Sequence, residues 1–268
     1  MRGRIAVSVD GGVATVTIDN PSQRNAVTRA MCLALQEWMP RLDADPDVVI
    51  VTIRGAGDSF CAGAALGEIR SILLDPVDGS TVDHLSRADM AITSVTKPTV
   101  ALVDGACMGG GWQIASACDF IIASERSLFG ITPARLGVLY PRPGIERLVS
   151  QVGPAVAKYI LFSGQTFGAA RASDLGLIAD VVADADFPSR CDELIASLLR
   201  RSQFSVHSLK RLVDLTVARS AAADAEWEAA WLAMDESPDL AIGVDAFLQR
   251  TEPLFTWRPP APLDSRSS

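Results

Sequence analysis

Residues 99–111 read TVALVDGACMGGG, and the fold can be worked out from this stretch. Its first five residues, Thr99–Val103, form an uninterrupted apolar run, which is typical of a β-strand covered on both faces. An Asp-Gly pair ends the run, and three glycines then lead into a helical segment that extends to Ala117. The stretch therefore predicts a buried strand, a short glycine loop and a helix.

The same order of elements occurs earlier in the chain, where the apolar run Val48–Ile53 precedes the loop SFCAGAAL at 59–66. The first residues of a helix leave backbone N–H groups unpaired, and glycine allows a ligand to approach them closely. Two such donors converging on one point would hold an oxyanion. Tight strand-to-helix turns explain the same pattern, and so does a phosphate loop, although neither GxxxxGK[ST] nor GxGxxG occurs.

Strands and helices alternate along most of the chain, which predicts right-handed crossovers and a mostly parallel sheet. Two β-branched runs joined by Asp10-Gly11-Gly12 predict an N-terminal hairpin, and Thr28 is expected to cap the first helix. Ser127–Pro143 is expected to be a long functional loop. The other expected elements are a polar connection at 75–81, a helix at 82–95, short strands at 120–123 and 178–182, and C-terminal helices at 191–201, 204–219, 224–234 and 241–250.

The composition indicates one globular α/β chain, since 49% of its 268 residues are hydrophobic and 21% are charged. No repeat or linker divides it, so we expect an α/β core over 1–200, a C-terminal helical region over 201–258 and a frayed tail over 259–268. The net charge of −8 would repel phosphate backbones and anionic bilayers, which argues against nucleic acid and membrane partners. A phosphorylated small molecule is not excluded, because a few arginines can act locally.

Cysteine and histidine usage argues against disulfides and metal sites. The five cysteines are scattered, no CxxC pair occurs, and the chain has two histidines. The apolar run at 5–9 is too short for a signal peptide, and no uncharged apolar run approaches about 18 residues. We therefore expect reduced thiols, no metal or redox cofactor, no membrane span and a cytoplasmic protein.

An ordered set of short motifs resembles the enoyl-CoA hydratase/isomerase, or crotonase, superfamily. The motifs follow one another in that family's order between about residues 18 and 182: Asn25-Ala26-Val27, Phe60-Cys61-Ala62-Gly63-Ala64, Lys97-Pro98, the stretch from Val103 to Gly111, and Ala117-Cys118-Asp119-Phe120. Residues 246–255 resemble the family's last helix. The resemblance implies a spiral of ββα units with a C-terminal helical trimerisation region, and acyl-CoA thioesters as substrates.

The resemblance also implies roles for particular residues. The N–H groups of Ala64 and Gly110 match the oxyanion-hole positions, where they would bind the thioester oxygen and stabilise an enolate. Arg24, Ala62 and Arg250 match positions that contact coenzyme A. Coenzyme A would thus enter as part of the substrate, with no separate cofactor, and the chain would form a homotrimer or a dimer of trimers.

The sequence departs from the family's pattern where hydratases carry two catalytic glutamates. Gln113 occupies one of these positions and Pro133 the other, and double-bond isomerases also use the second. An amide cannot take up a proton at pH 7, and proline has no acid–base group. Pro141 and Ala65 stand where other members often carry aspartate. Efficient hydration of crotonyl-CoA is therefore not expected.

Three functions are compatible with an oxyanion hole that lacks these groups. The first is decarboxylation of a malonyl-type thioester, since loss of CO₂ generates the enolate directly. Tyr140 matches a tyrosine of the methylmalonyl-CoA decarboxylase branch, although that branch has histidine in place of Ala64. The second is hydratase or isomerase chemistry with relocated groups, and the third is acyl-CoA binding without turnover. Candidates for relocated groups are Glu68, Asp83, His84 and Asp89.

Some of these candidates have simpler interpretations. The hydroxyl of Tyr140 could anchor its loop through a hydrogen bond. His84 lies in a polar stretch and is expected to be exposed to solvent. His207 lies beyond the matched core and is given no role.

Overall fold

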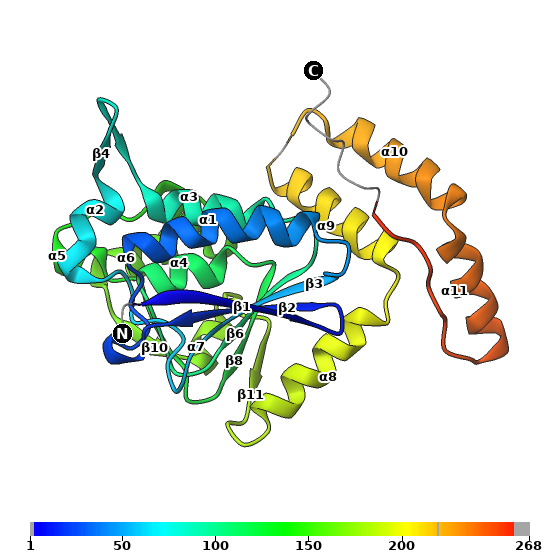
Figure 1. Cartoon of the computed structure of the whole chain (residues 1–268), viewed down its shortest axis with the longest axis horizontal. Helices are drawn as coiled ribbons and strands as arrows, with labels where there is room; N and C mark the ends of the chain where they lie inside the picture. The colour runs from blue at the N-terminus through cyan, green and yellow to red at the C-terminus, as the bar shows by residue number, and fades with distance from the viewer. Residues whose placement is uncertain (1–2, 219, 260–268) are drawn as a thin grey trace.

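A six-stranded sheet forms the centre of the molecule, of which the computed structural model describes residues 3–218 and 220–259 (Figure 1). Its strand order is β1-β2-β3-β6-β8-β11, with β1 antiparallel to β2 and every other pair parallel. The strands are β1 (Arg4–Asp10), β2 (Val13–Asp19), β3 (Ile50–Gly55), β6 (Thr99–Val103), β8 (Phe120–Ser124) and β11 (Asp180–Val182). The predicted α/β class, N-terminal hairpin and mostly parallel sheet are confirmed.

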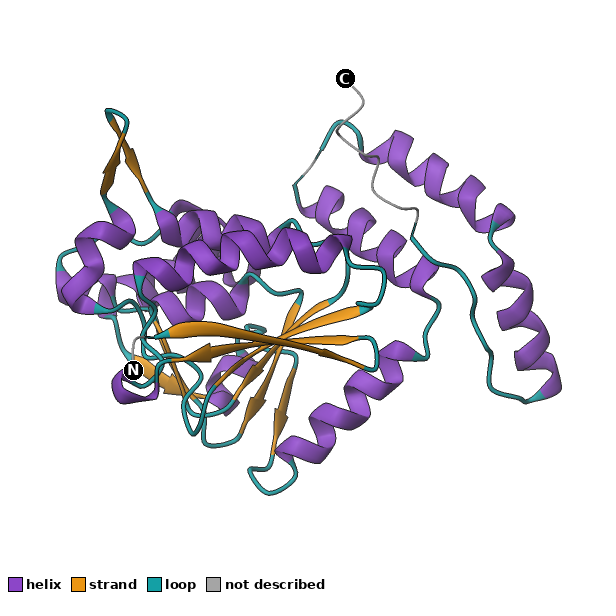
Figure 2. Cartoon of the chain, in the orientation of Figure 1, coloured by secondary structure: helices purple, strands orange, loops and turns teal. Residues whose placement is uncertain are grey.

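Helices cover both faces of this sheet (Figure 2). One face carries α1 (Arg29–Ala44), α3 (His84–Thr93) and α4 (Gly110–Ser116), and the other carries α8 (Phe187–Leu199). Thr28 caps α1 as predicted, because its side chain accepts a hydrogen bond from the N–H of Met31 at 3.3 Å. Apolar side chains of α8 pack against β3, β6, β8 and β11, which explains why these strands are apolar on both faces.

A second, three-stranded sheet lies beside the first in the order β10-β9-β7. Its strands are β7 (Ala106–Met108), β9 (Leu128–Gly130) and β10 (Thr166–Gly168). The expectation of one long loop over Ser127–Pro143 is wrong, because this segment contains β9 and the short helix α5 (Pro133–Leu136). The polar stretch at 75–81 belongs to a projecting hairpin, β4 (Asp75–Val77) and β5 (Ser80–Val82). Strands of three residues are too short to show a hydrophobic period.

From Arg142 onward the described chain is mostly helical (Figure 1). Besides α8, its helices are α6 (Arg142–Ser163), α7 (Ala169–Asp174), α9 (Gln203–Val217), α10 (Ala223–Glu236) and α11 (Pro238–Gln249). Earlier in the chain lie the short helix α2 (Ile69–Leu73) and two 3-10 turns, Pro21–Gln23 and Leu66–Glu68. The helices α10 and α11 stand away from the sheet. Arg219, placed in a helix by the sequence pattern, lies outside the described residues, as do residues 260–268 of the expected frayed tail.

Buried lysine and cysteine side chains reinforce the core. The amine of Lys97 donates hydrogen bonds to the carbonyls of Leu42 and Asp45, which joins the end of α1 to the start of β6. Lys210, on α9, forms a 2.9 Å ion pair with Asp119. All five cysteines are buried free thiols, and burial raises the pKa of Cys61 to about 12. Among the described helices, none is both long and apolar enough to cross a bilayer.

Candidate active site

A cavity of about 270 Å³ opens where the two glycine loops meet. The first loop contributes Ala62–Ala64 and the second contributes Gly109 and Gly110. The other lining residues are Leu66, Ile69, Leu73, Leu85, Thr132, Pro133, Arg135, Leu136, Val138, Leu139, Tyr140 and Pro141. No carboxylate of the described residues lines this cavity, and its wall is mostly aliphatic, so it suits an apolar chain better than a charged one.

The N–H groups of Ala64 and Gly110 lie on the same part of the cavity wall. A Cβ placed on Gly110 would lie 3.1 Å from the nitrogen of Ala64, so the two loops are in contact. Neighbouring N–H groups are paired: that of Ala65 donates to Val27 at 2.8 Å, and that of Gly109 donates to Gly130 at 2.8 Å. Within residues 3–218 and 220–259, neither the Ala64 nor the Gly110 N–H has a hydrogen-bond acceptor. Two unpaired donors in this arrangement can bind one anionic oxygen.

Local backbone geometry explains why glycine occupies the second loop. Gly109 has a φ of 47° and a ψ of −106°, a conformation that residues with a Cβ strongly disfavour. Gly111 lies so close to the first loop that a Cβ there would be 2.5 Å from the carbonyl oxygen of Cys61. The same Cys61 carbonyl accepts a hydrogen bond from Met108 at 2.9 Å, which holds the two loops together.

Gln113 lies behind the cavity wall, inside a polar cluster. Its side chain is fully buried, and its amide nitrogen donates to a carboxylate oxygen of Asp89 at 2.5 Å. Asp89 is 1% exposed and receives two further hydrogen bonds from the guanidinium of Arg147, at 2.8 and 2.9 Å. Arg147 also donates to Ser116 at 3.1 Å. Among the described residues the amide oxygen of Gln113 has no partner, and it lies against Gly144, where a Cβ would be 2.0 Å away.

Pro133 and Tyr140 lie in the wall itself. Pro133 is the first residue of α5 and is partly exposed to the cavity. Tyr140 is 8% exposed and donates its hydroxyl to the carbonyl oxygen of Gly109 at 3.0 Å. Burial raises the pKa of Tyr140 well above its ordinary value, so the hydroxyl keeps its proton. The structure thus places Tyr140 at the cavity as a donor to the backbone, which is the geometry expected of a loop anchor.

The candidates for relocated acids and bases are all engaged elsewhere, outside the cavity wall. Glu68 accepts a hydrogen bond from the N–H of Arg29, Asp83 caps α3, and Asp89 pairs with Arg147. The expectation that His84 is exposed is wrong, because it is 3% exposed and lies 2.9 Å from a carboxylate oxygen of Asp75.

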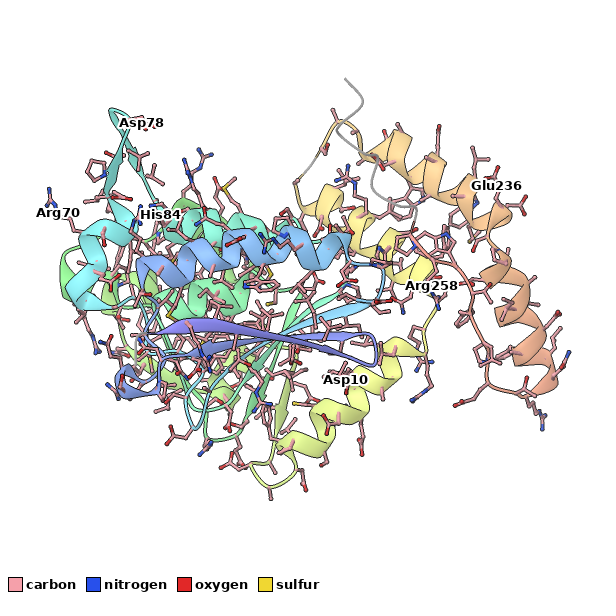
Figure 3. All side chains as sticks on the ribbon, in the orientation of Figure 1. Asp10, Arg70, Asp78, His84, Glu236 and Arg258 are labelled. Atoms are coloured by element: carbon pink, nitrogen blue, oxygen red, sulfur yellow. The ribbon has the colours of Figure 1, made fainter. Side chains whose placement is uncertain are left out.

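His84 is buried at the base of the β4–β5 hairpin, where its ring meets Asp75, the first residue of β4, and α3 packs against α1. Figure 3 shows His84 at the base of this hairpin, whose tip carries Asp78. Hydrogen bonds from His84 and Arg29 lower the pKa of Asp75.

The three candidate coenzyme A contacts lie in two places. Arg24 is exposed in a left-handed conformation, and its carbonyl accepts a hydrogen bond from the N–H of Ala62 at 2.9 Å, so both adjoin the first loop. Arg250 ends α11, on the opposite side of the molecule from α2 and α5, which wall the cavity (Figure 1). Within one chain, therefore, the structure brings together Arg24, Ala62, Ala64, Gly110 and Tyr140, but not Arg250.

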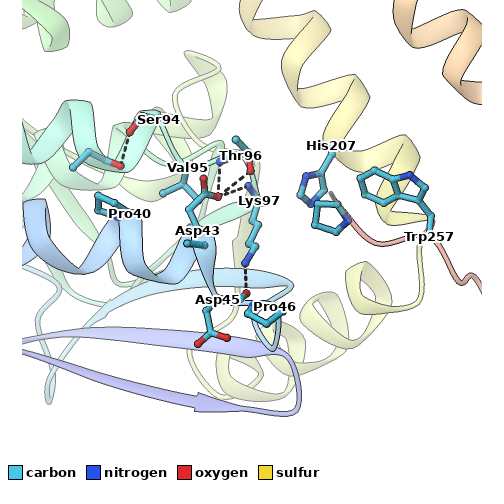
Figure 4. A pocket seen from close by; sticks show the side chains of 13 residues that line it. Pro40, Asp43, Asp45, Pro46, Ser94, Val95, Thr96, Lys97, His207 and Trp257 are labelled. Carbon is cyan, nitrogen blue, oxygen red and sulfur yellow. Dashed lines mark hydrogen bonds between the residues drawn. The ribbon is translucent and has the colours of Figure 1, made fainter. Parts of the chain in front are cut away.

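A second cavity, of about 680 Å³, lies between the ends of α1 and α3 and the helix α9 (Figure 4). Lys97, His207 and Trp257 line it, and the rings of His207 and Trp257 meet edge to face with centroids 5.6 Å apart. Burial lowers the pKa of both Lys97 and His207. This cavity is separate from the glycine loops. The sequence predicts no role for His207, and its ring makes a packing contact with Trp257.

Comparisons with known proteins agree with the architecture. The family model described as enoyl-CoA hydratase/isomerase matches residues 8–258. Enoyl-CoA isomerase/hydratase fer4 of Mycosarcoma maydis is 30% identical over 91% of this chain and 93% of its own. Probable enoyl-CoA hydratase EchA14 of Mycobacterium tuberculosis is 39% identical over 67% of this chain and 70% of its own.

Solved structures give the same result. A crystal structure of an enoyl-CoA hydratase/isomerase family member is 62% identical with a TM-score of 0.95, covering 97% of this chain and 99% of that one. A putative family protein from Hyphomonas neptunium is 30% identical with a TM-score of 0.85, covering 95% and 98%. The chain belongs to the enoyl-CoA hydratase/isomerase family and has the crotonase fold. It is therefore a member of a superfamily of acyl-CoA-processing enzymes.

Proposed function

We propose that this chain binds acyl-CoA thioesters with the thioester oxygen between the N–H groups of Ala64 and Gly110, and stabilises an enolate there. The observation that carries the proposal is the pair of unpartnered donors on the wall of an apolar cavity. A thioester oxygen becomes anionic in the enolate, so donors fixed at that point stabilise the transition state more than the substrate. Arg24 and Ala62, beside the first loop, are proposed to contact coenzyme A, which enters as part of the substrate.

We further propose that the chain is a poor hydratase. Adding water across a double bond needs a group to activate the water and a group to protonate the product. None of the described residues brings a carboxylate to the cavity wall, Gln113 lies behind the wall, and the hydroxyl of Tyr140 is bonded to the backbone. General acid and base groups each contribute about 10²–10⁴-fold, so crotonyl-CoA hydration should be slower than in efficient hydratases by at least about 100-fold.

Decarboxylation of a malonyl-type thioester is the second candidate reaction, and the cavity's lack of a base favours it. Cleavage of the bond between Cα and the carboxylate releases CO₂ and leaves its electron pair in the enolate, so no protein base is required. Protonation of the enolate at Cα then completes the reaction. The third candidate, binding without turnover, needs the same donors and no acid or base.

One set of assays separates these functions. Crotonyl-CoA hydration is followed by loss of enoyl absorbance, methylmalonyl-CoA decarboxylation by release of CO₂, and binding by thermal stabilisation with acyl-CoA esters. Gly110→Pro removes one donor at the first residue of α4, a position where proline is tolerated, and should lower turnover about 100–1000-fold. Unchanged turnover in a folded Gly110→Pro variant would show that the assigned oxyanion hole is wrong.

We also propose that the chain forms a trimer or a dimer of trimers. Large apolar side chains are exposed along α9, α10, α11 and the segment that follows: Leu209, Val213, Val217, Trp227, Trp231, Leu232, Leu240, Val244, Phe247, Leu248 and Leu254. An exposed apolar surface of this extent favours association with other subunits. In an assembly, Arg250 would reach the site of a neighbouring subunit. Light scattering at micromolar concentration tests this, and a monomer would contradict it.

A further inference from the structure

One hydrogen bond links the outer wall of the glycine-loop cavity to the second glycine loop. Tyr140 lies between α5 and α6 and donates its hydroxyl to the carbonyl oxygen of Gly109 at 3.0 Å. That oxygen and the N–H of Gly110 belong to the same planar peptide unit and point in opposite directions. The peptide that presents one of the two unpaired donors is therefore held at its other end by Tyr140.

This peptide has unusual conformational freedom. It joins two residues of the run Gly109–Gly111, so no Cβ on either side limits its rotation. Its carbonyl accepts two hydrogen bonds, one from the N–H of Gln113 at 3.0 Å and one from Tyr140. The first hydrogen bond belongs to the opening turn of α4, and the second comes from the side chain of Tyr140, between α5 and α6. Rotation of the peptide away from the cavity would break both bonds.

The same hydrogen bond affects the strength of the donor. A donor to the carbonyl of an amide polarises the whole amide and makes its N–H a stronger donor, by about 10–30% per bond in condensed-phase estimates. The Tyr140 side chain is buried and keeps its proton, so it acts as a donor throughout the neutral range. The Gly110 N–H would thus already be polarised when a thioester oxygen binds to it.

We propose that Tyr140 is a positioning residue of the oxyanion hole: its hydroxyl orients and polarises the Gly109–Gly110 peptide, so that the Gly110 N–H points at the thioester oxygen. The inference rests on the proposed role of Ala64 and Gly110. It couples two parts of the cavity, because Tyr140 also belongs to the wall that would surround the acyl chain. Acyl groups that displace this wall would weaken the donor that stabilises the enolate.

The test removes the hydroxyl alone. Tyr140→Phe keeps the ring and its packing, and Tyr159→Phe is the matched control, since Tyr159 is exposed and bonds to Gln165 at 3.2 Å, away from the cavity. The probe is para-dimethylaminocinnamoyl-CoA, whose absorption moves to longer wavelength when hydrogen bonds polarise its carbonyl. The wild type and Tyr159→Phe should show this shift. Tyr140→Phe should bind the probe within about 10-fold of wild type but lose most of the shift.

The outcomes separate this inference from the proposed function. No shift with the wild type would contradict the oxyanion hole itself. A full shift in the wild type and in Tyr140→Phe would keep the oxyanion hole and overturn the role of Tyr140. For whichever thioester is turned over, kcat should fall about 10-fold in Tyr140→Phe with little change in KM.

A second measurement needs no ligand. The amide proton resonance of Gly110 should move upfield in Tyr140→Phe, because the polarising bond to its peptide is lost, and should stay in place in Tyr159→Phe. A melting temperature near that of wild type would show that the Tyr140→Phe fold is intact. An unmoved Gly110 resonance in that folded variant would overturn the proposal whether or not the probe binds.

Discussion

Gln113 and Pro133 are the two residues that the sequence resemblance matches to the catalytic carboxylates of hydratases, and their surroundings differ. Gln113 is fully buried in a cluster with Asp89 and Arg147, and the nitrogen of its side-chain amide donates to the buried carboxylate of Asp89. Pro133 faces the cavity at the start of a short helix and makes no polar side-chain contact. The residue at position 113 is therefore constrained by its buried polar contacts, whereas the residue at position 133 is constrained only by the shape of the cavity wall.

The largest expected effect comes from placing a carboxylate at position 113. Gln113→Glu would set a second carboxylate about 2.5 Å from that of Asp89, with Arg147 as the one cation of the cluster. An uncompensated buried charge costs about 3–5 kcal/mol, so the free energy of unfolding in urea should fall by that amount at pH 7. The double variant Gln113→Glu, Asp89→Asn restores one carboxylate to one guanidinium and should recover much of the loss. Equal stability of Gln113→Glu and wild type would contradict the described cluster.

Gly144 offers a smaller perturbation of the same interior position. A Cβ at Gly144 would lie 2.0 Å from the amide oxygen of Gln113 and 2.5 Å from a ring carbon of Tyr140. Overpacking of this kind costs about 1–3 kcal/mol, so Gly144→Ala should lower the urea midpoint. Gly168→Ala is the control, because a Cβ there meets nothing within 4 Å. Equal midpoints for the two variants would show that the interior can relax around position 144.

Pro133 should accept a carboxylate with little effect on stability. Glutamate suits the first turn of a helix, and loss of proline's restriction on the unfolded chain costs about 0.4–1 kcal/mol, so Pro133→Glu should change the free energy of unfolding by less than about 1 kcal/mol. It would also add a proton acceptor to the cavity. Crotonyl-CoA hydration should rise at least about 10-fold over that of Pro133→Gln, which has similar shape and no charge. Equal rates would mean that position 133 does not reach the reacting carbons.

The smallest effect concerns the base of the β4–β5 hairpin, outside the cavity wall, where Asp75 is bonded to His84 and Arg29 just after α2. These bonds hold the pKa of Asp75 below its ordinary value of about 3.9. A group whose pKa is lower in the folded state stabilises the fold above its unfolded pKa, and this contribution is lost as the pH falls through the folded pKa. The difference in stability between wild type and Asp75→Asn should therefore shrink as the pH falls below about pH 4. A difference that was as large at pH 3 as at pH 5 would contradict the sign of this shift.

The sequence was sufficient to predict the elements that have a clear hydrophobic pattern. The apolar runs of β3 and β6, the hairpin β1–β2 and the helix caps follow from residue types a few positions apart. The strands β7, β9 and β10 were missed because each has three residues and lies beside glycines or turns. Their pairing depends on contacts between distant segments, as between Cys107 and Phe129.

The chemistry of the candidate site was predicted unevenly for the same reason. Ala64 and Gly110 could be singled out from two local patterns, a strand followed by glycine and then a helix. The burial of Gln113 could not be predicted in this way, because the other members of its cluster, Asp89 and Arg147, lie 24 and 34 residues away along the chain. His84 is expected at the surface because its sequence neighbours are polar, yet its ring is buried at the base of the hairpin, against Asp75.

Of the 24 basic residues of the chain, three are lysines, and two of these are the buried Lys97 and the ion-paired Lys210 described above. Acyl thioesters transfer their acyl groups spontaneously to unprotonated amines, whereas guanidinium groups stay protonated and do not react. Lys158, on α6, is the exposed lysine that completes the set. A protein that works among reactive thioesters thus presents its positive charge almost entirely as arginine, and chemical damage by its own substrates would accumulate at Lys158.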